Sequence, residues 1–497
     1  MNQNERNENP NKPRPDSRPP VSQNHPPRRP GAQNPPPHVP RPQEGRPPSD
    51  QRQQPRGVAQ RPPARAAQVP TARPQERRPM NSAVAVEPKV SLLAHWGRKL
   101  LGSTDYIRPA DIVRTKGGVD RPMLIIIILL TAIGSILIFT SSYATALSRW
   151  GDSFHYIRPQ VAWVALGMAA MVGIMHIDYR LMRKFAVHFF VLCVILLIAT
   201  LFVGGARGLA QRWLTIPLGF MTITFQPSEL MKLGIAMILA RYYHKNAVKV
   251  VSKNSIIIFG RIKIKEASVY GVFLPAIIVG AVCALIMAQN HFSGTIIMFL
   301  IGAFIIWASG AQKFWLISSS VAALVGVIMT IMTVPYARTR ITTWLNPENY
   351  SITNELWQIT QGLLAIGSGG FFGVGLGNSR QKHMFIPEPQ NDFIFTVAAE
   401  ELGFVGAVGI LALYLVFIWR GYKIAQNAPD IFSKLLAFGI VSKVGIQTIL
   451  NIAVVTGSIP NTGISLPFAS YGGTALVMLL AEMGILLSIS RYSYQQK

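Results

Sequence analysis

Acidic residues are scarce in this chain of 497 residues, in which 22 Asp and Glu stand against 48 Lys and Arg. Charged residues of both signs make up only 14% of the sequence, whereas hydrophobic residues make up 49%. A typical soluble domain carries roughly 25% charged residues, so this composition argues against a soluble protein. Apolar runs of membrane-spanning length recur from residue 123 onward and predict an integral membrane protein.

Cysteine is the second scarce residue type. The chain has two, Cys193 and Cys283, each inside an apolar run. Neither lies in a CxxC or Cys/His spacing, which argues against a disulfide framework and against a structural zinc site. Both are therefore expected to be small residues of the core.

The first 90 residues lack an apolar segment, which argues against a signal peptide. They hold 22 of the 35 prolines, and 16 Lys and Arg against 7 Asp and Glu. Such a segment cannot bury enough apolar surface to fold, so we expect residues 1–90 to form a disordered cytoplasmic tail. A solvated tether is the simplest interpretation. Binding to anionic membrane lipid or to a partner protein is favoured over binding to nucleic acid.

The apolar runs predict an all-α bundle of ten membrane-spanning helices. The predicted ranges are 122–145, 159–177, 184–204, 228–243, 268–288, 293–309, 313–334, 394–418, 432–456 and 471–490. Lys and Arg concentrate in the segments that this arrangement places inside, as the positive-inside rule requires. We therefore expect both termini in the cytoplasm. The predicted parts after the tail are a juxtamembrane segment at 91–121, the membrane domain at 122–490 and a short C-terminus at 491–497.

Three outer segments are rich in Gly, Pro and Trp, namely 205–227, 335–393 and 457–470. The second, between helices 7 and 8, is far longer than an ordinary helix connection, and long loops are commonly functional. Within it, residues 353–366 have the spacing of an amphipathic helix, which could lie on the membrane surface or insert halfway. Function is expected on this extracytoplasmic side.

Charged residues inside apolar runs mark candidate sites, because a charge at membrane depth costs at least ~2.5 kcal/mol. In "FQPSELMKL", Pro227 favours a helix start, and Glu229 and Lys232 are three residues apart on one helical face. They form either a simple intramembrane ion pair or the charged wall of a cavity. Arg212 and Trp213 lie just upstream and suit a phosphorylated ligand.

A polar stripe runs along the ninth predicted helix, where Lys443, Gln447 and Asn451 are spaced by four residues. Amide side chains often hydrogen-bond between membrane helices. The stripe is therefore either a seam between helices or part of a cavity, and in both cases it faces the interior of the bundle.

A glycine-rich loop at 366–385 leads into "FIPEPQNDFIF". Its glycines permit positive φ, which fits a tight re-entrant turn better than a phosphate cradle, because no βαβ unit precedes it. Asp392 stands just before an apolar run, with Glu400 and Glu401 about two helical turns further on. Asp392 is either a helix N-cap or a general base at the membrane edge.

Four motifs follow one another along the chain: "FQPSELMK", "WQITQGLLAIGSGGFFGVGLGN", "IPEPQNDFIFTVAAEELG" and "TGSIPNTGISLPFASYGGT". In this order they resemble the SEDS family (shape, elongation, division and sporulation), which includes FtsW and RodA. The resemblance covers residues 120–492, and "GLGNSRQK" is closer to the FtsW division branch than to the RodA elongation branch. It implies a glycosyltransferase that polymerises lipid II, an undecaprenyl-pyrophosphate disaccharide-pentapeptide, into peptidoglycan. The implied place is the outer face of a bacterial cytoplasmic membrane, at the division septum.

The resemblance also places roles on residues. It implies that the catalytic carboxylate is Asp392, which as general base would take the proton of the acceptor 4-hydroxyl in an inverting displacement. Three nearby cations would keep it ionised, namely Arg338, Arg340 and Lys382. The residues expected to bind substrate are Arg212, Trp213, Glu229, Lys232, Arg338, Gln358, Gln361, Lys382 and Glu388.

The leaving pyrophosphate needs positive charge, which Arg212, Lys232 or a divalent cation such as Mg²⁺ or Mn²⁺ would supply. No organic cofactor is expected. Two departures from the family pattern stand out. Gln390 and Asn391 replace a His-Thr pair, so that His383 is the nearest histidine, and "AQNHFSGT" lacks an acid that many members carry there.

The partners that the resemblance implies are a single-pass class B penicillin-binding protein and small division regulators. Other functions stay open at this point. Intramembrane charges and broken helices also occur in transport pathways, which keeps a lipid II flippase or transporter as an alternative. An elongation polymerase and a non-enzymatic division scaffold are the others.

Overall fold

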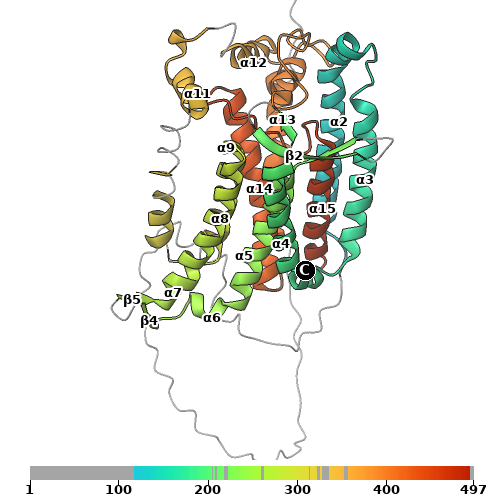
Figure 1. Cartoon of the computed structure of the whole chain (residues 1–497). Coiled ribbons are helices and arrows are strands. Elements are labelled where there is room, and N and C mark those ends of the chain that lie inside the picture. The colour runs from blue at the N-terminus through green and yellow to red at the C-terminus, as the bar shows by residue number, and fades with distance from the viewer. Residues whose placement is uncertain are drawn as a thin grey trace, which may run out of the picture. The chain divides into compact units, whose positions relative to one another are not determined.

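A computed structural model describes residues 117–203, 205–207, 210–217, 222–258, 262–312, 314–321, 325–326, 335–351 and 356–492 (Figure 1). All of them belong to one compact unit, Val86–Lys497. The predicted tail at 1–90, residues 91–116 of the juxtamembrane segment and residues 493–497 of the predicted C-terminus lie outside the described residues.

Long apolar helices run side by side through this unit (Figure 1). Seven are long and apolar enough to cross a membrane. They are α2 (Arg121–Trp150), α3 (Ile157–His176), α4 (Tyr179–Val203), the continuous α7–η2–α8 (Glu266–Ser268, Val269–Phe273 and Leu274–Ala288), α13 (Ile394–Gln426), α14 (Ile431–Val455) and α15 (Gly473–Ser490). Two further helices, α5 (Pro227–Lys245) and α9 (Phe292–Ala308), complete the described bundle. The protein is therefore mostly helical, as predicted.

The predicted helix count of ten stays a prediction. Each predicted span other than 313–334 corresponds to a helix of the structure. Within 313–334, residues 314–321 and 325–326 are helical, while 327–334 lie outside the described residues.

Helix boundaries follow capping chemistry. The Asp120 side chain accepts a hydrogen bond from the Met123 amide at 2.9 Å and so caps α2. Gly151 ends the same helix at φ 69°, a left-handed conformation that glycine adopts without a steric cost. At the start of α14, Asp430 and Ser433 form a reciprocal capping box.

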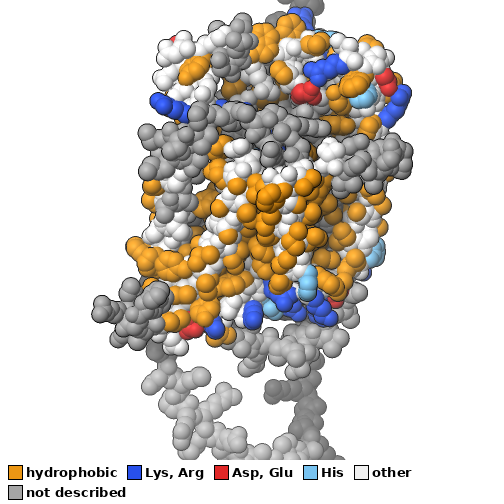
Figure 2. Space-filling model, in the orientation of Figure 1, with side chains coloured by type: hydrophobic (Ala, Val, Ile, Leu, Met, Phe, Trp, Pro, Cys, Tyr) orange, Lys and Arg blue, Asp and Glu red, His pale blue; other side chains and the backbone are white. Residues whose placement is uncertain are grey.

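The centre of the bundle is α14, which packs against α5, α9 and α13. In α14 and α15, 72% and 67% of the most apolar window is buried, against 17% in α3 and 22% in α4. Helices α3 and α4 therefore direct most of their apolar surface outward, as membrane helices that contact lipid do. Figure 2 shows hydrophobic side chains over the middle of the bundle and Lys and Arg side chains toward its two ends.

Two small antiparallel sheets correct the expectation of an all-α fold. One sheet joins β1 (Gly205–Arg207), β2 (Ala210–Pro217) and β3 (Thr222–Phe225), with Leu214 opposite Phe225. The other is the hairpin of β4 (Ser255–Ile258) and β5 (Ile262–Lys265), which follows the short helix α6 (Ala247–Val250). Short segments in which polar and apolar residues alternate, such as "TITF", form these strands, and they are too short to stand out as apolar runs.

The segment 335–393 contains α11 (Pro335–Leu345), the 3₁₀ turn η3 (Pro347–Asn349) and α12 (Trp357–Ser368), followed by irregular chain. Helices α11 and α12 lie at the end of the bundle opposite β4 and β5 (Figure 1). The amphipathic helix predicted at 353–366 is confirmed as α12. Its buried residues are Gln361, Gly362 and Ala365, and Gly362 lies against the Phe393 ring at the start of α13.

Candidate active site

A cavity of about 700 Å³ lies between α3, the sheet strand β2, α5, α9, α14, the chain that precedes α13 and the chain that leads into α15. Its lining residues are Tyr156, Pro159, Trp163, Arg212, Trp213, Thr224, Gln226, Glu229, Lys232, His291, Ser293, Gly294, Ile297, Glu388, Gln390, Asn391, Asp392, Gln447, Gly463, Ile464, Ser465 and Tyr471–Ala475. This volume is in the range of small-molecule sites. We call it the main cavity.

The main cavity brings together six of the predicted site residues from three separate parts of the sequence. They are Arg212, Trp213, Glu229, Lys232, Glu388 and Asp392. Their roles as catalytic or substrate-binding residues stay predictions, but their shared position is a property of the fold.

Asp392 precedes α13 and is held by its backbone. Its carbonyl accepts a hydrogen bond from Nδ2 of Asn451 at 2.8 Å, and the same Nδ2 donates to the Ile464 carbonyl at 2.7 Å. The N-cap of α13 is Phe393, without a side-chain cap, so the alternative role of Asp392 as the N-cap is wrong. The Asp392 side chain lines the main cavity instead.

Gly463 allows the chain opposite Asp392 to approach closely. Its φ is 64°, and a Cβ atom at this position would lie 3.1 Å from Oδ2 of Asp392. A larger residue would therefore be strained in its backbone and would crowd the carboxylate.

Burial raises the pKa of Asp392, and the positive charges of Arg212 and Arg340 oppose this rise. Of the cations predicted to act on this carboxylate, Arg340 is thus confirmed as a neighbour, and Arg212 is an additional one. Arg338 is exposed and lines no described cavity.

A charged pair from α5 lines the same cavity, and we call it the cavity pair. Lys232 Nζ lies 2.7 Å from Oε1 of Glu229, with 2% and 18% of the two side chains exposed. Pro227 starts α5, and this start places both residues within its first two turns. A second pair, Lys443 of α14 and Glu482 of α15, also has a distance of 2.7 Å and is buried.

The predicted polar stripe on α14 does face inward. Lys443 pairs with Glu482, Gln447 lines the main cavity, and Asn451 holds the backbone of Asp392. The stripe is therefore both a seam to neighbouring elements and a cavity wall.

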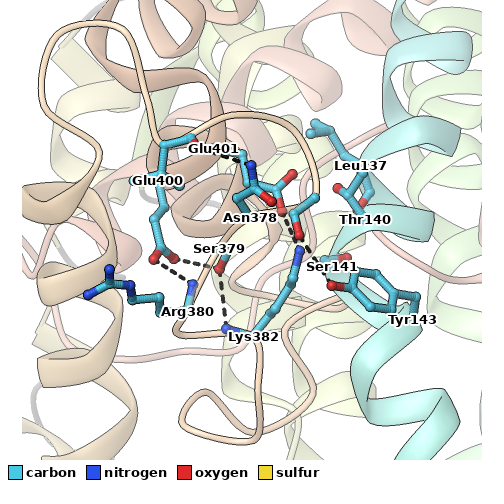
Figure 3. Close-up of polar contacts among 12 residues, drawn as sticks. Leu137, Thr140, Ser141, Tyr143, Asn378, Ser379, Arg380, Lys382, Glu400 and Glu401 are labelled. Carbon is cyan, nitrogen blue, oxygen red and sulfur yellow. Dashed lines mark hydrogen bonds and ion pairs between the residues drawn. The ribbon is translucent and has the colours of Figure 1, made fainter.

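Lys382 is enclosed elsewhere, which corrects the expectation that it acts as a cation beside Asp392. Its Nζ lies 2.7 Å from Oε1 of Glu401, both side chains are 0% exposed, and the Tyr143 ring lies 4.6 Å from the ammonium. Figure 3 shows Lys382 and Glu401 pointing toward each other beside α2, the helix that contains Tyr143. Glu400 accepts hydrogen bonds from Ser379 Oγ and the Arg380 amide. We call Tyr143, Ser379, Lys382, Glu400 and Glu401 the enclosed cluster.

The glycine-rich loop is a tight turn, and several of its amides are engaged within the protein. Its amides at Val374 and Gly375 donate to the carbonyls of Glu400 and Glu401, each at 3.0 Å. Gly373 has φ 81°, and a Cβ atom there would lie 2.2 Å from the Glu401 carbonyl oxygen. The turn at Gly373 therefore meets α13 next to Gly403, whose φ of 69° interrupts the helical conformation of α13.

Glu388 lines the main cavity, forms an ion pair with Arg149 and accepts a hydrogen bond from Gln390 at 2.7 Å. Two other predicted residues, Gln361 and Gln358, lie outside this cavity. Gln361 is buried on α12. Gln358 lines a second cavity, described below.

Several cavity residues were not anticipated from the sequence, among them Tyr156, Trp163 and Tyr471. They come from helix ends and loops that are distant in sequence. One hint of these residues was present in the sequence, namely the glycine pair of "SYGGT". In the structure, a Cβ atom at Gly473 would lie 2.2 Å from Nε1 of Trp163, so the close approach of these two residues requires glycine.

The carboxylates of the main cavity do not form a ready divalent-cation site. Glu229 is paired with Lys232 and Glu388 with Arg149, which leaves Asp392 as the one cavity carboxylate outside an ion pair among the described residues. No group of three His, Cys, Asp or Glu in the described part of the chain could hold a metal ion. The predicted Mg²⁺ or Mn²⁺ requirement remains a prediction.

An apolar helical bundle around a polar, charged cavity is typical of an integral membrane protein. Residues 120–495 match the family model FTSW_RODA_SPOVE, described as cell cycle protein, and the chain belongs to this family.

Two relatives illustrate this membership. Stage V sporulation protein E of Bacillus subtilis (strain 168) is 38% identical over 377 residues, which cover 75% of this chain and 97% of that protein. The probable peptidoglycan glycosyltransferase FtsW of Geobacter sp. (strain M18) is 34% identical over 380 residues, which cover 76% of this chain and 98% of the relative.

Solved structures share the fold. A peptidoglycan synthase complex, described as coordinating polymerization and crosslinking, contains a chain with a TM-score of 0.60 and 24% identity, covering 76% of this chain and 99% of that one. A mutant of the rod shape determining protein RodA of Thermus thermophilus gives a TM-score of 0.54 and 25% identity, with the same two coverages.

Proposed function

We propose that this protein is a peptidoglycan glycosyltransferase that polymerises lipid II, with Asp392 as its general base. The observation that carries the proposal is the position of Asp392, which faces a 700 Å³ cavity together with Arg212 and the cavity pair. The family and the glycosyltransferase named among its members supply the substrate class.

The chemistry is an inverting displacement. Asp392 accepts the proton of the acceptor 4-hydroxyl as that oxygen bonds to the anomeric carbon of the donor sugar. The bond from this carbon to the pyrophosphate oxygen breaks, and the electron pair leaves with the lipid pyrophosphate. General-base assistance of this kind contributes about 10²- to 10⁴-fold to a rate. A partly buried carboxylate with a raised pKa is a stronger base than an exposed one.

Arg212 and Lys232 stabilise the negative charge that develops on the leaving pyrophosphate. Both line the cavity that contains Asp392, so the cations and the base are available to one bound substrate. Fixed positive charge in a site with little water stabilises such a transition state more than it would in bulk water.

The cavity opens on the extracytoplasmic side in this proposal, with both termini in the cytoplasm. Basic residues support this orientation, because Arg183 of α4 and Arg241 of α5 meet at one end of the bundle, where Arg241 donates to the Arg183 carbonyl. A class B penicillin-binding protein would crosslink the product. Division, rather than elongation, is favoured by the FtsW relatives, and a septal location with small division regulators follows from it.

Lipid II transport is the second candidate. Two buried Lys–Glu pairs, Glu229–Lys232 and Lys443–Glu482, are the observation that favours it, since transport pathways also carry intramembrane charges. A scaffold without catalysis would not need the polar cavity.

One experiment separates these functions. The purified full-length protein, with its cognate class B penicillin-binding protein and Mg²⁺ or Mn²⁺, is incubated with lipid II, and glycan chains are resolved on a gel. We expect chains from the wild type and none from Asp392→Asn. If neither forms chains while a known polymerase does, and the wild type moves lipid II across vesicle membranes, transport replaces polymerisation.

A further inference from the structure

A second cavity of about 360 Å³ lies beside the main cavity. It is formed by α11, the start of α12, Pro387 and Asn461. No residue of this second cavity lines the main cavity. Its volume is at the lower end of the range for ligand sites, roughly 300–1,000 Å³.

The two cavities share a wall. Pro387 lines the second cavity and the next residue, Glu388, lines the main one. Asn461 lines the second cavity, whereas Gly463, which lies against Asp392, lines the main one. A chain-like ligand that has one unit at Asp392 therefore needs to pass only this short wall to place another unit in the second cavity.

Arg340 connects the two cavities electrostatically. It lines the second cavity, and its Nη1 donates to the Asn461 carbonyl. Its positive charge also acts on Asp392 across the wall, where it opposes the rise that burial causes in the pKa of that carboxyl group.

Two indole rings are fixed in this second cavity. Trp344 Nε1 donates to the Gly457 carbonyl at 2.8 Å, and Trp357 Nε1 donates to the Phe385 carbonyl at 2.6 Å. Each hydrogen bond holds its ring in place from the polar edge, so the ring faces remain available for apolar contact. The apolar C–H face of a pyranose ring packs well on such a surface.

Polar groups surround these rings. Gln358 Oε1 accepts a hydrogen bond from Asn461 Nδ2 at 3.0 Å, which orients both amides at the cavity. Thr343 is only 7% exposed, and its buried Oγ1 has no hydrogen-bond partner among the described residues. A buried hydroxyl without a partner costs about 1–3 kcal/mol, so a ligand hydroxyl that reaches it would be bound favourably.

We propose that the second cavity is a saccharide subsite, which holds a sugar ring of the glycan chain while a neighbouring ring is at Asp392. The inference rests on the proposed function. Aromatic faces for C–H surfaces, together with a hydroxyl, amides and a guanidinium for sugar hydroxyls, match a carbohydrate better than a lipid tail. An alkyl chain would leave the Thr343 hydroxyl without a partner.

A binding experiment tests the subsite without requiring turnover. The probe is a lipid-free tetrasaccharide of alternating GlcNAc and MurNAc, which has no pyrophosphate and cannot act as a donor. Its affinity for the full-length protein in nanodiscs is measured by titration calorimetry. We expect Thr343→Val, which removes one neutral hydrogen bond, to weaken binding by about threefold to tenfold. Trp344→Ala should weaken it at least as much.

Matched controls keep the result specific. Thr342→Val is the same change on α11 at a residue that lines neither cavity, and Trp419→Ala removes an exposed indole of α13. Both should bind the tetrasaccharide like the wild type, and Thr343→Ser should restore the affinity that Thr343→Val loses. Equal affinity of the wild type, Thr343→Val and Trp344→Ala would overturn the subsite. Absence of tetrasaccharide binding by the wild type would also overturn it.

Product length provides a second measurement. If the subsite holds the growing chain, Thr343→Val should shorten the glycan products relative to the wild type and to the Thr342→Val control, which changes a residue outside both cavities. Unchanged chain length together with unchanged affinity contradicts the proposal. Failure of the wild type to make any glycan contradicts the proposed function instead, and the tetrasaccharide measurement then decides the subsite separately.

Discussion

Two buried Lys–Glu pairs of this protein have the same chemistry and different surroundings. In the cavity pair, Lys232 and Glu229 are 2.7 Å apart, and 18% of the Glu229 side chain is exposed to the cavity. In the enclosed cluster, Lys382 and Glu401 are also 2.7 Å apart, and neither side chain has exposed surface. The distance between two charges therefore does not identify a binding site. What distinguishes the cavity pair is the open volume beside it.

The surroundings explain the difference. Lys232 is next to a cavity that also contains Arg212 and Asp392, so a ligand could contact its charge. Lys382 is packed under the Tyr143 ring and beside the glycine turn that meets α13 at Gly403 (Figure 3). The enclosed cluster fixes the loop that leads to Asp392.

Removal of the Lys382 charge should lower the stability of the protein more than any other substitution considered below. Lys382→Met leaves the Glu401 carboxylate buried without its partner, which costs about 3–5 kcal/mol. We expect a strongly lowered thermal unfolding midpoint in detergent. The double variant Lys382→Met/Glu401→Gln should recover most of the stability and the activity. An unchanged midpoint for Lys382→Met alone would show that this pair does not support the loop.

Removal of the Lys232 charge should have the next largest effect, on polymerisation. Lys232→Met removes a fixed positive charge from the leaving-group side, and we expect a loss of about 10²-fold in rate. The unfolding midpoint should fall less than in Lys382→Met, because cavity water can solvate Glu229. Here the double variant Lys232→Met/Glu229→Gln should recover stability but not activity. Recovery of activity would place the cavity pair in the same structural role as the enclosed cluster.

The pH dependence should show a smaller effect of Arg212. Burial raises the pKa of Asp392 above its ordinary value of 3.8, and Arg212 and Arg340 oppose this rise. Since the base must be unprotonated, the rate should fall as pH decreases through a pKa above 3.8. Arg212→Gln removes an opposing cation, so the acidic limb of the kcat/KM profile should move to higher pH. An unchanged limb would mean that Asp392 is not the group that titrates.

His383 should matter least. Its ring contacts Tyr143 edge-on with a centroid distance of 6.2 Å, and it is exposed at the edge of the enclosed cluster. His383→Ala should change the polymerisation rate by no more than about twofold, as for most surface substitutions. A loss as deep as that of Asp392→Asn would move the proton acceptor from the cavity to this loop.

Much of the fold was predictable because apolar run length determines where a membrane helix can lie. Helix α5 was expected at 228–243 and spans Pro227–Lys245. Helix α13 was expected to end at 418 and continues to Gln426. The two cations in this last part both have partners, because Arg420 pairs with Asp120 and Lys423 lies over the Trp419 ring. The β1–β2–β3 sheet was not predicted, since its strands are short and depend on pairing with one another.

The candidate site was predictable only in part. Proximity along one helix identified the cavity pair, and the motifs singled out Asp392. The partner of Lys382 was not identifiable, because the turn at Gly373 and the kink at Gly403 bring Glu401 to it, and these depend on tertiary contacts. The same holds for Gly463 and Tyr471, which reach the main cavity from beyond α14.

The most direct test of the role of Asp392 compares lipid II affinity with the single-turnover rate for the wild type and Asp392→Asn. If Asp392 is the base, the affinity should stay within about threefold while the rate falls by about 10²- to 10⁴-fold. A retained rate would contradict this role, and so would a loss of rate that only follows a loss of lipid II binding.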